Sequence, residues 1–184
     1  MTRLISRKTL LLLCLLLLAY SVHAFEVDGI VYRITSEELT VEVTSRSSKY
    51  EVDIVVPQTV KYNQKTYTVT DIGNKAFYRC SVLSGFELPS TIKTIGEYAF
   101  RGCSSLASVT IPNSVTTIEN LAFDRCISLT AVTIPNSVTS IGFGAFLRCS
   151  GLLTLTIPNS VTSIGEYNQE IKGETNVEII PVSA

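Results

Sequence analysis

A period of 23 residues runs through the middle of the chain and constrains its fold more than any other feature. Four kinds of residue recur at this spacing in separate columns. The columns are Pro89, Pro112, Pro135 and Pro158; Cys80, Cys103, Cys126 and Cys149; Phe77, Phe100, Phe123 and Phe146; and Ile72, Ile95, Ile118, Ile141 and Ile164. Such a period predicts a solenoid, in which each unit packs only on its two neighbours.

Each unit is expected to contain one strand and one tight turn. In the second unit, Val109 and Ile111 alternate with polar residues, which is the pattern of a strand with one buried face. Pro112 lacks an N–H group and therefore ends the hydrogen-bonded ladder. The apolar residues within 122–126 have the spacing of a short helical or 3₁₀ turn that packs on the opposite side. One unit cannot bury both edges of its apolar layer, so the units must stack.

The repeated motif is Leu-x-x-Val-x-Ile-Pro-x-Ser-Val-x-x-Ile-Gly-x-x-Ala-Phe-x-x-Cys, within residues 69–165. It resembles the BspA-like leucine-rich repeats of bacterial surface and secreted proteins, and its period lies in the range of leucine-rich repeats. The resemblance implies a leucine-rich-repeat solenoid of about four units, with a parallel sheet on the concave side and short turns on the convex side. Three departures occur: Glu119 replaces the glycine, Leu121 stands where a polar residue or tyrosine is common, and Phe86 and Leu88 replace the Val and Ile of the first strand.

Residues 25–68 differ from the repeat and predict an N-terminal β-strand cap. They alternate apolar and polar residues in three stretches typical of strands, around Ile30–Ile34, Leu39–Val43 and Val52–Val56. A hairpin then follows, in which Val60–Tyr62 pairs with Tyr67–Val69. This segment is expected to continue without a break into the first repeat.

Residues 166–184 form an irregular tail or cap, and two interpretations stay open. The apolar stretch 177–181 has the composition of a capping strand. The alternative is the unstructured end of a truncated, longer product. An uncapped solenoid end would expose apolar core surface and favour association.

Residues 1–24 have the features of a secretory signal peptide. Arg3, Arg7 and Lys8 precede an apolar run over 10–19, and small or apolar residues lead to a cleavage point after Ala24. The run is about half the length of a membrane-spanning helix. We therefore expect export without a membrane span after cleavage, to the cell surface or the medium, with the periplasm as a further destination.

Composition excludes several functions. The formal net charge is −1 and no segment is dense in Lys or Arg, which argues against a nucleic-acid partner. The single histidine, His23, lies in the signal peptide, so residues 25–184 lack every histidine-based triad and metal site. We predict no catalytic residue, no metal site, no cofactor and no enzymatic activity. The carboxylates are scattered and predict no cleft: Glu87, Glu97, Glu119, Asp124 and Glu166.

The cysteine column favours buried free thiols. A small, weakly polar side chain fills a tight apolar site well. Neighbouring solenoid strands lie about 4.8 Å apart, so disulfides are sterically allowed and export would supply an oxidising compartment. Zinc is disfavoured because a linear column does not bring four ligands to one point.

Two further columns are expected to face solvent. Alternation places one set of polar side chains on the concave side, where solenoids usually bind ligands. The predicted ligand-binding residues are Glu87, Ser108, Thr110, Thr133, Thr154 and Thr156. The alternative is that threonine is present because it is a good strand former. Arg79, Arg125 and Arg148 share a column that is expected to be a solvated convex face, and Arg101 breaks its register.

The resemblance implies a secreted or cell-surface recognition or adhesion module. Its expected partners are proteins or glycans on a host or neighbouring cell. The alternative is a structural spacer, or a truncated fragment of a longer repeat protein, with no ligand of its own.

Overall fold

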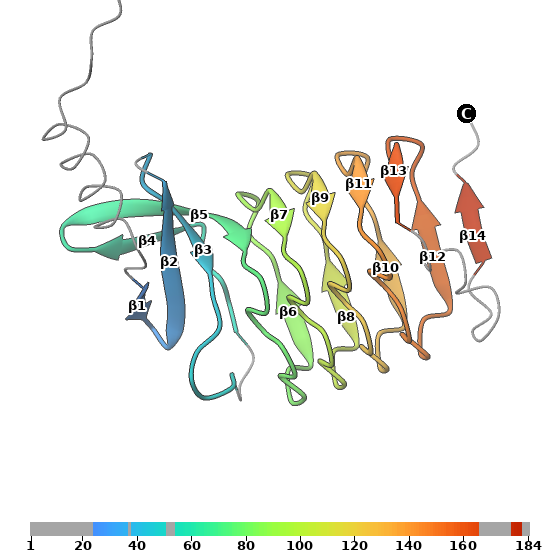
Figure 1. The fold of residues 1–184 in the computed structure, drawn as a ribbon, viewed down its shortest axis with the longest axis horizontal. Coiled ribbons are helices and arrows are strands. Elements are labelled where there is room, and N and C mark those ends of the chain that lie inside the picture. The colour runs from blue at the N-terminus through green and yellow to red at the C-terminus, as the bar shows by residue number, and fades with distance from the viewer. Residues whose placement is uncertain (1–23, 37, 51–53, 166–177, 182–184) are drawn as a thin grey trace, which may run out of the picture.

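The chain forms a solenoid of stacked coils preceded by a β-strand cap, as Figure 1 shows for a computed structural model of the protein. The structure describes residues 24–36, 38–50, 54–165 and 178–181. The predicted signal peptide up to residue 23 and most of the C-terminal tail lie outside these ranges. The predicted leucine-rich-repeat solenoid is confirmed, and each coil contributes to two parallel sheets.

The longer strands form the first sheet, in which all pairs are parallel. Its strands are β6 (Gly85–Glu87), β8 (Ser108–Thr110), β10 (Ala131–Thr133), β12 (Thr154–Ile157) and β14 (Glu178–Pro181). In β6, β8, β10 and β12 the central side chains, such as Val109 and Val132, point into the core and are buried. β14 pairs with β12 in register and continues this sheet towards the C-terminus.

A second parallel sheet lies across the core from the first, as Figure 1 shows. Its strands are β7 (Thr94–Ile95), β9 (Thr117–Ile118), β11 (Ser140–Ile141) and β13 (Ser163–Ile164). The sequence identified this isoleucine column as core but not as strand, because two residues are too few to display an alternating pattern. A threonine ladder reinforces the sheet: the hydroxyl of Thr116 donates to the Lys93 carbonyl at 3.3 Å, and that of Thr139 to the Thr116 carbonyl at 3.3 Å.

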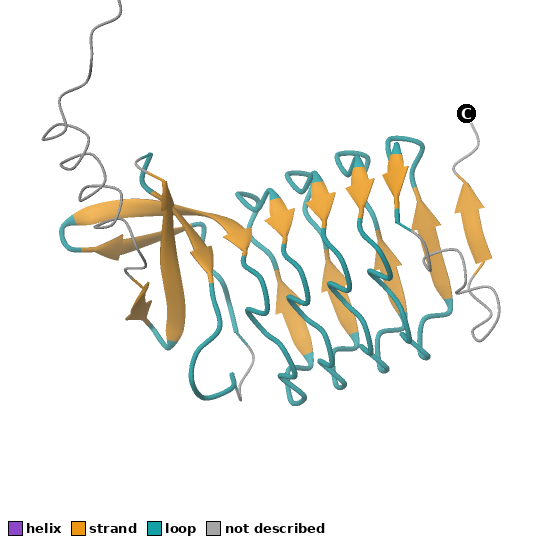
Figure 2. Ribbon diagram, viewed as in Figure 1, coloured by secondary structure: helices purple, strands orange, loops and turns teal. Residues whose placement is uncertain are grey.

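The third side of each coil consists of turns, and the predicted short helical turn is wrong. Figure 2 shows strands and loops but no helix in the described part of the chain. Within one turn, the Cys126 N–H donates to the Phe123 carbonyl at 3.1 Å, but the Phe123 N–H donates across to Ala145 of the next coil at 2.7 Å. Leu121 and Arg125 also have positive φ, of 55° and 61°. Bonding between coils and left-handed residues together prevent a helical ladder.

A column of phenylalanines runs through the core from coil to coil. The ring centroids of Phe77 and Phe100 lie 5.2 Å apart, those of Phe100 and Phe123 5.1 Å, and those of Phe123 and Phe146 5.3 Å. The rings are nearly parallel and fully buried. Tyr50 of the cap packs on Phe77 at 5.0 Å and continues the column. The repeat therefore aligns one aromatic side chain per coil into a continuous stack.

The N-terminal cap begins as an antiparallel sheet that then joins the solenoid. Its strands are β1 (Ala24–Val27), β2 (Ile30–Ser36), β3 (Thr40–Val43), β4 (Thr59–Tyr62) and β5 (Lys65–Ile72). β4 and β5 form a hairpin through Asn63 and Gln64, whose positive φ values of 48° and 63° are those of a two-residue primed turn. β5 pairs in parallel with both β3 and β7, so the cap is continuous with the sheet of short strands.

The third strand predicted in the cap, around Val52–Val56, is not formed in its described part. Residues 51–53 lie outside the described ranges. Val55 makes only an isolated parallel bridge to Glu87. That bridge nevertheless extends the sheet of longer strands by one position on its N-terminal side.

Candidate functional site

The sequence-predicted ligand-binding residues lie on the outward face of the sheet β6–β8–β10–β12, which we call the long-strand face. The strand register arranges them in two rows. The first row is Glu87 of β6, Thr110 of β8, Thr133 of β10 and Thr156 of β12; the second is Gly85, Ser108, Ala131 and Thr154 of the same strands. The structure therefore brings all six predicted residues onto one surface.

The side chains of this face are presented to solvent by a rigid frame. Glu87, Ser108, Thr110 and Thr133 are exposed, whereas the central residue of each of their strands is buried. Among the described residues, these four side chains make no hydrogen bond or ion pair, so their polar groups are available. Adjacent strands hold equivalent groups about 4.8 Å apart. The first row is a line of hydroxyl groups that begins with the carboxylate of Glu87, whereas Gly85 and Ala131 interrupt the second row.

Val55 lies at the end of the Glu87 row, and sequence reasoning missed it. Its side chain is 77 % exposed, the largest value among the exposed large apolar residues of the described chain. The missed signal was its neighbour, Val56-Pro57, which repeats the strand-ending Ile-Pro of the later units. The long-strand face therefore has an apolar contact beside the Glu87 carboxylate.

The four cysteines of the repeat column are buried free thiols, as the sequence predicts. Each of three thiols donates to a carbonyl of the preceding coil: Cys103 to Phe77, Cys126 to Phe100 and Cys149 to Phe123, each at 3.1 Å. Desolvation by burial raises the pKa of Cys103 and of Cys149 to about 12, and it also raises the pKa of Cys126. A protonated thiol is a poor nucleophile and a poor metal ligand, so this column is structural.

We expect the four repeat cysteines to resist alkylation by iodoacetamide at pH 8 in the folded protein, and to react fully once guanidinium unfolds it. The pKa of Cys103 rises from 9.0 to about 12 on folding. The associated stabilisation is therefore complete below pH 9 and is lost as the pH rises from 9 to 12. Mass spectrometry of each cysteine-containing peptide measures the reaction, and thermal melts across pH 7–11 measure the stability. Rapid labelling of the folded protein would contradict a buried, protonated column.

An ion-pair cluster lies on the turn side, and sequence reasoning did not find it. Asp124 is only 1 % exposed, and its Oδ2 lies 2.8 Å from Nε of Arg101. Arg148 approaches Oδ1 to 3.7 Å, and Arg125 approaches Oδ2 to 4.0 Å. Asp124 occupies the same repeat position as Arg101 one coil before it, and this spacing of 23 was the available signal. The scattered carboxylate is thus the centre of a positively charged cluster.

Contrary to the sequence analysis, a cleft of about 340 Å³ forms on the opposite edge and contains four carboxylates. They belong to Glu42, Asp71, Glu97 and Glu119. Burial raises the pKa of Glu42, the ion pair with Arg33 lowers it, and Asp71 raises it again. Among the described residues, no three acidic, cysteine or histidine side chains are grouped as metal ligands. Because Arg33 pairs with it, the Glu42 carboxylate is held as one half of an ion pair.

The two stacked parallel sheets and the core columns define a leucine-rich-repeat solenoid. The family model described as "BspA type Leucine rich repeat region" matches residues 68–179 in six copies. This match covers more than half of the chain, which therefore belongs to the BspA-type leucine-rich repeat family. No curated protein matches the sequence.

Solved structures of bacterial repeat proteins share the fold. A leucine-rich repeat protein from Bacteroides ovatus is 37 % identical, with a TM-score of 0.73 over 78 % of this chain and 38 % of its own. The Treponema pallidum leucine-rich repeat protein is 30 % identical, with a TM-score of 0.72 over 82 % of this chain and 68 % of its own. The pneumococcal vaccine antigen PcpA, at 20 % identity and a TM-score of 0.62 over 85 % of this chain and 43 % of its own, shows the fold alone. This chain thus spans well under half of the Bacteroides protein.

No helix in the described part of the chain is long and apolar enough to cross a membrane.

Proposed function

We propose that this protein is an exported recognition module that binds a protein or a glycan through the long-strand face. One observation carries the proposal: Glu87, Ser108, Thr110 and Thr133 are exposed and unpaired among the described residues, at equal spacing on a continuous sheet. Hydroxyl groups both donate and accept hydrogen bonds, so such a row suits the polar edges of sugars and peptides.

Rigidity supports binding on this face. The strands are held by parallel pairing on both sides, and the phenylalanine stack lies behind them. A surface that is ordered before binding loses little conformational entropy when a ligand docks. Several weak polar contacts at once can then sum to a useful affinity.

Export and a non-catalytic role belong to the same proposal. The charged start, apolar run and small residues before position 25 support secretion to the surface or the medium. Residues 25–184 contain no histidine, and the column thiols are buried and protonated. The groups that remain accessible are suited to binding rather than to nucleophilic catalysis.

The double variant Thr110→Lys/Thr133→Lys is expected to abolish saturable binding to a ligand found on an array of matrix proteins and glycans. Two lysines on adjacent strands would place bulk and positive charge in the middle of the first row. We expect at least a tenfold loss of affinity, because the two lysines would keep a ligand from the neighbouring residues of the row as well. Binding is measured by surface plasmon resonance with the purified protein.

The matched control is Thr116→Lys/Thr139→Lys, which makes the same chemical change on two adjacent coils outside this face. Both residues are exposed, and their side chains belong to the ladder beside the short strands. Circular dichroism and thermal melting should show that both double variants remain folded. Unchanged affinity in the Thr110/Thr133 variant would exclude the long-strand face as the binding surface.

A structural spacer is the second candidate, and the composition of the face favours it. Threonine at three of the four positions of the first row is also what a sheet selects for strand propensity alone. A spacer would be folded and monomeric and would bind nothing on the array. A saturable interaction that the control retains and the Thr110/Thr133 variant loses would exclude this second role.

A further inference from the structure

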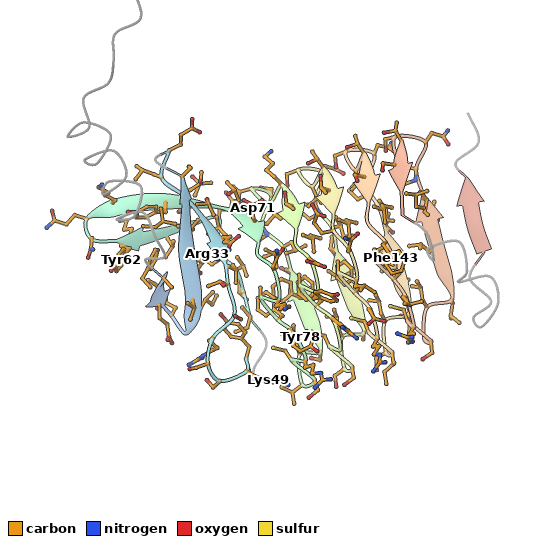
Figure 3. All side chains as sticks on the ribbon, viewed as in Figure 1. Arg33, Lys49, Tyr62, Asp71, Tyr78 and Phe143 are labelled. Atoms are coloured by element: carbon orange, nitrogen blue, oxygen red, sulfur yellow. The ribbon has the colours of Figure 1, made fainter. Side chains whose placement is uncertain are left out.

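Five cationic side chains lie along the turn side of the coils, which we call the basic edge. It consists of Lys49, Arg79, Arg101, Arg125 and Arg148. Lys49 reaches the first repeat, where its Nζ donates to the Arg79 carbonyl at 3.0 Å. Figure 3 shows Lys49 and Tyr78 together at this side of the solenoid, opposite Asp71. The turns of four successive coils therefore form one cationic line.

A single carboxylate, that of Asp124, offsets only part of the charge of the basic edge. The four repeat turns, residues 76–84, 99–107, 122–130 and 145–153, contain one acidic residue, Asp124, which is buried. The side chains of Arg125 and Arg148 are 53 % and 54 % exposed even though both approach Asp124. Removing the three cationic residues of the signal peptide leaves 12 basic against 16 acidic residues, a net charge of −4. Five of those 12 cations are nevertheless gathered on this one side.

Backbone geometry does not explain the arginines. Arg79, Arg125 and Arg148 have φ values of 57°, 61° and 56°, in the left-handed region that glycine adopts most easily. The fourth member of the column is indeed glycine, Gly102, with a φ of 74°. Three exposed arginines therefore occupy positions where glycine would be less strained. Tyr98 and Leu121 have positive φ in the same turns, so this geometry belongs to the repeat and does not by itself require arginine.

We propose that the basic edge binds an anionic polysaccharide. Arginine presents a planar fork of donors that matches sulfate or carboxylate groups in two-point contacts. Three coils separate Arg79 from Arg148, a span of about 14 Å at 4.8 Å per coil. Such a line of cations fits a short stretch of a linear polymer with regularly spaced anionic groups.

The tyrosines of this edge favour a polysaccharide over a nucleic acid. The guanidinium carbon of Arg79 lies 5.3 Å from the ring centre of Tyr78, and that of Arg101 lies 5.2 Å from the ring centre of Tyr98. Lys75 also lies over Tyr98, at 5.7 Å. Single-stranded nucleic acids bind by stacking their bases on free aromatic faces. Because cations already cover these rings, the edge recognises charge rather than bases.

The test measures binding of the purified protein to a heparin oligosaccharide and to polygalacturonate, which separates a sulfate from a carboxylate preference. We expect saturable binding to at least one of them, weakening steeply as salt is raised. Arg79→Gln/Arg125→Gln should lower the affinity at least tenfold and flatten the salt dependence. Arg79→Gly/Arg125→Gly removes the same charges and introduces glycine, which Gly102 already shows to be compatible with this backbone. If only one of the two double variants loses binding, the cause is a folding defect and not the loss of charge.

Lys61→Gln/Lys65→Gln is the matched control. It removes the same net charge from the exposed hairpin of the cap and should leave binding within twofold of the unmodified protein. The proposal is overturned if neither polysaccharide binds at low salt, or if the two arginine pairs bind as well as the control. It is also overturned if oligothymidylate of equal charge binds as tightly, since the edge would then accept any polyanion. The Thr110/Thr133 experiment concerns a different face, so either proposal can fail alone.

Discussion

Replacing Phe123 with alanine is expected to lower the free energy of unfolding by about 3–5 kcal/mol, the range for a fully buried phenylalanine. Its ring is stacked between Phe100 and Phe146, at 5.1 and 5.3 Å, and is 0 % exposed. The backbone of each coil is hydrogen-bonded to both neighbours, so the coils cannot close together to fill the cavity. Two aromatic contacts are lost as well, each contributing about 0.5–1.5 kcal/mol beyond burial.

Phe143→Ala is the control for this prediction. Phe143 is 40 % exposed and lies outside the core column, so the same substitution should cost about 1 kcal/mol or less. Urea unfolding followed by circular dichroism gives both values. Equal losses for the two variants would mean that the stack does not support the solenoid. A shallower transition in Phe123→Ala would show that the coils on its two sides unfold separately, as expected of repeat proteins.

The fold was readable from the sequence because every coil repeats the same core positions. The phenylalanine and cysteine columns, the inward valines of the long strands and the prolines that end them all recur at one spacing. A single unit would leave the choice between strand and helix open, but identical columns in successive units require stacked, parallel coils. The two rows of the long-strand face follow from this register together with the alternation of the strands.

Features that depend on contacts between coils could not be read in this way. The turn side was expected to be helical because Phe123 and Cys126 have helical spacing, yet their N–H groups bond differently, one across to the next coil and one within the turn. The short strands have only two residues each, so they carry no alternation. Glu42 reaches the acidic cleft from the cap, outside the repeat, where no column predicts its position.

The ion-pair cluster around Asp124 was missed because it, too, depends on contacts between coils. A sequence shows that Tyr78, Arg101, Asp124 and Leu147 share one column, but not that their side chains contact one another. In the structure Arg101 lies near the rings of Tyr78 and Tyr98, at 6.0 and 5.2 Å, and beside the Asp124 carboxylate. An aromatic ring, a guanidinium and a carboxylate therefore follow one another on three consecutive coils. Arg101 therefore contacts side chains of both neighbouring coils and of its own coil.

Arg101→Met is accordingly expected to lower the free energy of unfolding by about 1–3 kcal/mol, the range for a buried polar group that loses its partner. Arg125 and Arg148 stay within 4.0 and 3.7 Å of the carboxylate, so the cost stays below that of an isolated buried charge. Methionine keeps much of the apolar stem but leaves the Asp124 carboxylate without its 2.8 Å partner. Arg148→Met is the control, because Arg148 is 54 % exposed and 3.7 Å away, so its loss should cost at most about 1 kcal/mol.

The double variant Arg101→Met/Asp124→Leu distinguishes a lost ion pair from lost packing. Leu147 already occupies the next position of this column, so the coil can accept leucine there. Replacing both charges with apolar groups removes the carboxylate that has lost its nearest cation, and most of the lost stability should return. Chemical unfolding of the wild type, the two single variants and the double variant completes a thermodynamic cycle. If the double variant is no more stable than Arg101→Met, the arginine acts through its packing on the tyrosines and not through Asp124.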